Sequence, residues 1–123
     1  MTRSFRRAGG RFTVPAASVA SVEVLEHLTP VPTAPAAVRG LVLVRGQVLP
    51  VIDVLPGEAQ PPARGALLVL VELGERSGRA ALVADEVDLD AAEARPLDLV
   101  ALATAIRDAI DAQGGFPGRA SGP

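Results

Sequence analysis

The chain has 123 residues, nearly half of them apolar, which suffices for one folded domain with a single core but not for two independent ones. Its 12 basic residues, all arginine, nearly balance 14 acidic residues, which argues against a nucleic-acid-binding surface as the main function. The absence of cysteine excludes a disulfide framework and thiolate chemistry, and no stretch is apolar enough for a membrane span, so we expect a soluble, cytoplasmic protein.

The N-terminal segment predicts a hairpin of two short strands over residues 4–14. Phe5 and Phe12 stand on either side of a glycine pair that favours a tight turn, and a proline follows the second strand. Residues 17–28 fit neither the helical nor the strand period, so a helical turn passing into a strand and a single element stay equally open. Three prolines within residues 29–35 disfavour helix and indicate an extended connector.

Two runs rich in valine and leucine, residues 41–44 and 48–54, predict a second hairpin. They flank Arg45-Gly46-Gln47, where glycine can adopt a positive φ at the turn without steric cost. Both faces of each run are largely apolar. We therefore expect this hairpin to be central and buried.

A loop rich in proline and glycine, residues 56–65, indicates the boundary between two lobes. Residues 66–73 and 79–87 then predict a third hairpin around a glycine-flanked polar turn. Near the end, Asp98 is placed to cap a helix that carries one apolar stripe. The stripe consists of Leu99, Leu102, Ile106 and Ile110.

A search for catalytic chemistry finds little in the sequence. His27 is the only histidine and reads as a surface or loop residue, and a chain without lysine cannot form a Walker-type phosphate loop. The acidic run of Asp85, Glu86, Asp88 and Asp90 lacks the spacing of a calcium-binding loop and is better interpreted as a solvated strand edge. We therefore expect no catalytic residue, no cofactor and no metal.

The arginines at positions 3, 6, 7 and 11 leave two interpretations open. Interleaved with phenylalanines, they are compatible with a small β-barrel that binds single-stranded nucleic acid. The alternative is a charged edge strand that discourages aggregation. Elimination thus leaves a binding module as the most plausible class of function.

Residues 32–54 closely resemble the signature of CheW-like domains. A proline-rich connector is followed by Val38-Arg39-Gly40, then by a strand ending in Val44-Arg45-Gly46, and then by a strand close to the family's Val-Ile-Pro-Val-Ile-Asp-Leu. Residues 10–19 and 67–87 resemble the family's strands on either side of this signature, and residues 97–102 resemble the family more weakly.

The resemblance implies a mainly β fold, with two intertwined SH3-like barrels and one C-terminal α-helix. It also implies a non-enzymatic chemotaxis adaptor that links a methyl-accepting chemoreceptor to a CheA-like histidine kinase. The matching partner-binding positions are Arg45, Val19 and Val22. Core packing is the alternative role for the valines and a turn-stabilising salt bridge for the arginine, whereas Asp53 and Pro50 are interpreted as structural.

Departures from the family pattern carry further expectations. The acidic residue usual two positions after Val19 is replaced by Ser21, with Glu23 two positions further on, so a carboxylate partner for Arg45 is not assured. The second barrel is expected to be incomplete, because only residues 88–96 separate the last hairpin from the helix. Exposed sheet edges would then favour either a homodimer or an adaptor with one partner surface, including a degenerate competitor that damps array signalling.

These expectations define a domain plan. Residues 1–112 form a single CheW-like domain, with a first lobe centred on residues 4–55, a second lobe centred on residues 66–96 and a helix over about residues 98–112, and residues 113–123 form a flexible tail.

Overall fold

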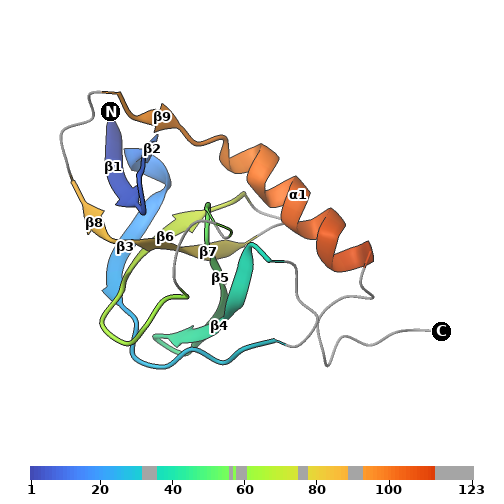
Figure 1. Cartoon of the computed structure of the whole chain (residues 1–123). Coiled ribbons are helices and arrows are strands. Elements are labelled where there is room, and N and C mark those ends of the chain that lie inside the picture. The colour runs from blue at the N-terminus through green and yellow to red at the C-terminus, as the bar shows by residue number, and fades with distance from the viewer. Residues whose placement is uncertain (32–35, 56, 58–60, 75–77, 89–92, 113–123) are drawn as a thin grey trace.

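The computed structural model describes residues 1–31, 36–55, 57, 61–74, 78–88 and 93–112. Over these residues the chain forms nine strands in two sheets, one short 3₁₀ turn and one C-terminal helix (Figure 1). The expected mainly β fold with a single C-terminal helix is confirmed.

The smaller sheet is built on the N-terminal hairpin. Strands β1 (Thr2–Arg7) and β2 (Gly10–Pro15) pair antiparallel, and the rings of Phe5 and Phe12 stack with their centroids 5.5 Å apart. Two short strands flank the hairpin: β8 (Glu86–Val87) runs antiparallel to β1, and β9 (Arg95–Pro96) runs parallel to β2. The predicted first hairpin is confirmed.

The larger sheet has the strand order β3-β6-β7-β5-β4. All of its pairs are antiparallel except β5 with β7. A 3₁₀ turn at Ala16–Ser18 leads directly into β3, so a helical turn passing into a strand is the correct alternative for this region. The strands of this sheet are β3 (Val19–Val24), β4 (Val38–Val44), β5 (Gln47–Ile52), β6 (Leu67–Glu72) and β7 (Arg79–Ala84).

The β4–β5 hairpin turns through Arg45 and Gly46, whose φ angles of 51° and 80° suit a two-residue turn with left-handed residues. The predicted hairpin is therefore correct, but its predicted central, buried position is wrong. Strand β4 lies at the edge of the sheet, and Leu43 and Val48, which face each other across the hairpin, are 68% and 61% exposed. Apolar residues on both faces of the hairpin suggested that both faces are covered. One face packs on the core, but the face that carries Leu43 and Val48 is exposed.

Both sheets combine segments from the two halves of the chain. Strand pairs β1–β8, β2–β9, β3–β6 and β5–β7 each join a strand before residue 56 to one after residue 61. The predicted boundary loop lies between these halves and falls partly outside the described residues. The lobes of the domain plan therefore interleave and do not each form a separate sheet.

The central strands β6 and β7 separate two hydrophobic clusters. Their buried residues alternate between the clusters, as the two-residue period of a strand requires: Val69 and Leu82 contribute to the first cluster, and Leu68 and Val83 to the second. Both clusters contain residues of β4 and β5, but only the first also contains residues from the smaller sheet and the helix. Coverage on both faces explains why β6 and β7 read as continuous apolar runs.

Helix α1 (Leu99–Ala112) completes the first cluster. Asp98 caps it, because the Asp98 side chain accepts a hydrogen bond from the Ala101 N–H at 3.0 Å. Leu99 is buried and Leu102 packs against the same cluster, as the predicted stripe requires. The side chains of Ile106 and Ile110, and the predicted tail, lie outside the described residues.

Candidate functional site: the open seam of the larger sheet

The two edge strands of the larger sheet, β3 and β4, come close together. Two backbone hydrogen bonds of 2.8 and 2.9 Å link Thr29, which follows β3, to Leu41 in β4. An ion pair joins Glu23 in β3 to Arg45 at the end of β4, with Arg45 Nη2 3.2 Å from Glu23 Oε2. The sheet therefore curls into an almost closed barrel. We call the strip between Glu23–Thr29 and Val42–Arg45 the seam.

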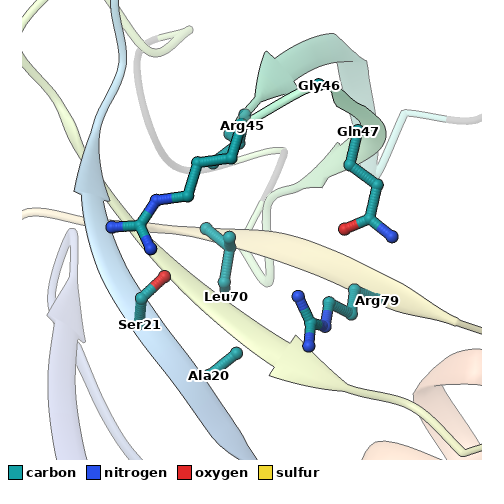
Figure 2. Close-up of a pocket in the computed structure, with 8 residues that line it drawn as sticks. Ala20, Ser21, Arg45, Gly46, Gln47, Leu70 and Arg79 are labelled. Atoms are coloured by element: carbon teal, nitrogen blue, oxygen red, sulfur yellow. The ribbon is translucent and has the colours of Figure 1, made fainter.

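Arg45 lies at one end of this seam, opposite the Thr29–Leu41 bridge. Its side chain is 79% exposed and extends from the hairpin turn toward β3, as Figure 2 shows. Glu23 Oε2 is buried and accepts no hydrogen bond among the described residues, so its contact with Arg45 is electrostatic. Ser21 and Glu23 lie on the same face of β3, which explains how Glu23 supplies the carboxylate that the family pattern places at position 21.

A groove of about 630 Å³ opens along the seam. Its walls combine charge with aliphatic surface: Glu26 and His27 are exposed beside Val24, which is 57% exposed. Leu43 continues this surface onto β4 and faces Val48 across the hairpin. The exposed position of His27 agrees with its interpretation as a surface residue. The groove is lined by Val22, Glu23, Val24, Glu26, His27, Thr29, Val42, Leu43, Val44 and Arg45.

Val19 and Val22 lie on the other face of β3. Val19 is paired with Val71 and packs against the first cluster, and Val22 is paired with Val69 of that cluster. Neither valine therefore shares a strand face with the Glu23 side chain that holds Arg45, although Val22 also borders the groove. Core packing is visible for Val19, and a partner-binding role for either valine stays a prediction.

At the end of the β4–β5 hairpin opposite its turn, a buried ionic cluster fixes the end of β5. Asp53 is fully buried and accepts hydrogen bonds from Arg7 at 2.6 and 3.0 Å, from Arg39 at 3.0 Å and from the Leu55 N–H at 3.1 Å. Burial opposes ionisation of this carboxyl, but these hydrogen bonds outweigh it and hold the pKa of Asp53 below its ordinary value. Asp53 thus has the structural role that we predicted.

The N-terminal arginines pair with the acidic run that the sequence analysis treated separately. Arg3 contacts Asp88 at 2.6 Å, Arg6 contacts Glu86 at 3.0 Å, and Arg7 contacts Asp85 at 3.2 Å. The hydrogen bond from Arg3 lowers the pKa of Asp88. Pairing of β1 with β8 brings these charges together, a contact across about 80 residues that no local pattern reveals. Three of the four cations of the nucleic-acid interpretation are thus neutralised, while Asp90 lies outside the described residues.

Among the residues that the structure describes, no group of three or more histidine, cysteine, aspartate or glutamate side chains is placed to hold a metal ion. The described residues also contain no helix that is both long enough and apolar enough to cross a membrane.

A search against protein-family models matches residues 3–96 to the CheW-like domain. The match covers both sheets and ends at β9. The chain belongs to the CheW-like domain family. CheW-like scaffolding proteins are non-enzymatic adaptors of chemotaxis.

The fold is also similar to a solved member of the family. The scaffolding protein TtCheW from Thermoanaerobacter tengcongensis superposes with a TM-score of 0.57 at 24% sequence identity, over 70% of this chain and 60% of that protein. The CheW-like chain described here thus spans about 60% of the length of TtCheW. A comparison with curated proteins finds no match.

Proposed function

We propose that this CheW-like protein is a cytoplasmic adaptor that links a methyl-accepting chemoreceptor to a CheA-like histidine kinase. CheW-like domains bind both kinds of partner, and the interface must be made of the surface that this chain leaves open. The observation that carries the proposal is the seam, where a highly exposed arginine is held by Glu23 beside exposed Leu43 and Val48. Residues 1–112 act as the single domain that presents it.

Exposed aliphatic side chains supply the affinity of the proposed interface. Burial of Leu43 and Val48 against a partner contributes roughly 1.5–3 kcal/mol for each side chain. A buried core of this kind, with a charged rim, is typical of interfaces that cover about 800 Å² per partner. Arg45 fits the rim, because it is exposed yet held in one direction by its contact with Glu23. We retain Val19 and Val22 as secondary candidates for partner binding, which would contribute by holding β3 in place against β6.

The proposal predicts that seam variants lose partner binding but stay folded. We expect Arg45→Glu to weaken binding of the receptor's cytoplasmic fragment or of the kinase's regulatory domain about tenfold, because it places a second carboxylate beside Glu23. Leu43→Ser should have a similar effect through lost apolar contact. Isothermal titration calorimetry with both purified partners measures each affinity, and circular dichroism checks the fold.

Matched controls separate the seam from general surface effects. Arg11→Glu makes the same charge change at an exposed position of the smaller sheet, and Val100→Ser removes an aliphatic side chain that is 73% exposed on α1. Neither should change either affinity. Equal losses in seam and control variants, or no binding of either partner by the unmodified chain, would refute the proposal. Binding of one partner only would identify the chain as a competitor in the array.

A further inference from the structure

A second cavity, of about 460 Å³, lies on the other side of the Arg45 side chain from the seam groove. Arg45, Gln47 and Arg79 all line this cavity. Figure 2 shows the Arg45 side chain extended toward Ser21 on β3, with Leu70 between it and Arg79 in this view. Arg79 is the first residue of β7 and lies near the β4–β5 turn because β5 and β7 pair in parallel, a pairing between segments far apart in the sequence. We call this space the arginine cavity.

Each arginine of the arginine cavity is paired with a glutamate that does not line the cavity. Arg79 donates from Nε to Glu72 at 2.7 Å, which leaves its two terminal nitrogens without a hydrogen-bond partner among the described residues. Arg45 contacts Glu23 through one terminal nitrogen only. Glu23 and Glu72 are absent from the described lining, which contains two guanidinium groups, one amide and no carboxylate. Each carboxylate thus orients its arginine without occupying the cavity.

This arrangement suits one class of ligand. A guanidinium presents several donors in a plane that matches the two oxygens of a carboxylate, and the Gln47 amide adds a neutral donor. The apolar floor of Leu70 and Ala20 suits the methylene groups of a glutamate side chain. We propose that the arginine cavity receives an acidic side chain of the adaptor's protein partner, which rests on the proposed function and adds the chemistry of the contact.

A small probe tests the cavity without any partner. N-acetyl-glutamate methylamide carries one glutamate side chain with blocked backbone ends, and the glutamine analogue is its neutral control. In nitrogen-15 NMR spectra, we expect the glutamate probe to produce saturable shifts of the Nε–H signals of Arg45 and Arg79, and the glutamine analogue to produce none. Arg79→Gln should abolish the shift of Arg45, whereas Arg11→Gln should leave it unchanged.

Three results would overturn the assignment. These are equal shifts with the two probes, a shift of Arg45 that survives Arg79→Gln, and shifts with inorganic phosphate but not with the glutamate probe. In the complex with receptor or kinase fragment, Arg79→Gln should weaken binding about tenfold and Arg11→Gln should not. Unchanged affinity of the Arg79→Gln variant refutes the inference and leaves the proposed function intact. A chain that binds the glutamate probe but neither partner refutes only the proposed function.

Discussion

Asp53 shows how a residue of the family signature acts on the whole fold without touching a partner. Its carboxylate is shared by Arg7 from the smaller sheet and Arg39 from the larger one, so a single buried anion ties the two sheets together. A strand-end carboxylate could be read from the sequence as structural. Its two arginine partners could not, because Arg7 lies 46 residues away and has no local signal that separates it from Arg3 and Arg6.

We predict that Asp53→Asn lowers the free energy of unfolding by about 3 kcal/mol, because it leaves two arginines with less compensation in a buried site. Asp88→Asn is the control. It removes the partner of Arg3 at an exposed position and should cost about 1 kcal/mol or less. Urea denaturation measures both. Similar losses in the two variants would show that burial does not distinguish these ion pairs.

Among the elements, local sequence patterns predicted the hairpins and the helix, which depend on residues close together in the chain. All three hairpins were found from their turn signals, and the helix was found from Asp98 and its apolar stripe. The resemblance implied that the barrels intertwine, but the particular pairings that join the two halves could not be predicted from local patterns, because they depend on which edges meet after collapse. For the same reason the candidate site was predicted only in part. Arg45 could be named and Glu23 noted beside it, but the sequence left their ion pair undecided and gave no sign that Arg79 is a neighbour.

Gly40 provides a test of how β4 is held at the seam. Its φ is 150°, and a Cβ atom there would lie 2.5 Å from the backbone oxygen of Thr29, which bonds the neighbouring Leu41. We predict that Gly40→Ala destabilises the protein by about 2 kcal/mol and loosens the seam. Urea denaturation checks the stability. Gly57→Ala, where a Cβ atom would meet nothing within 4 Å, should change it little, and equal effects would contradict this account.

For the molecule as a whole, stability against acid depends on carboxylates whose pKa is lowered by folding. The pKa values of Asp53 and Asp88 both lie below the ordinary value of an aspartate in the folded chain. A depressed folded pKa stabilises the protein above the unfolded value, and this stabilisation disappears as the pH falls through the folded value. Asp53 contributes more of this pH-dependent stabilisation than Asp88, because the ion pair between Asp88 and Arg3 is exposed to solvent.

We therefore predict little change in the free energy of unfolding between pH 7 and about pH 5, and a steep loss below about pH 4. Urea titrations at a series of pH values measure this profile. The Asp53→Asn variant should start from a lower stability and show a shallower loss. A profile of the same slope in this variant would assign the acid sensitivity to other groups.

The interleaved pairing of β1 with β8, β2 with β9, β3 with β6 and β5 with β7 also limits how such a gene can evolve. A crossover in the loop between β5 and β6 would combine halves from two ancestors that must match along four strand borders at once. We therefore expect recombination between diverged copies at this loop to yield poorly matched strand borders. New specificities must arise by point substitution on the outward-facing positions, with the two halves inherited together.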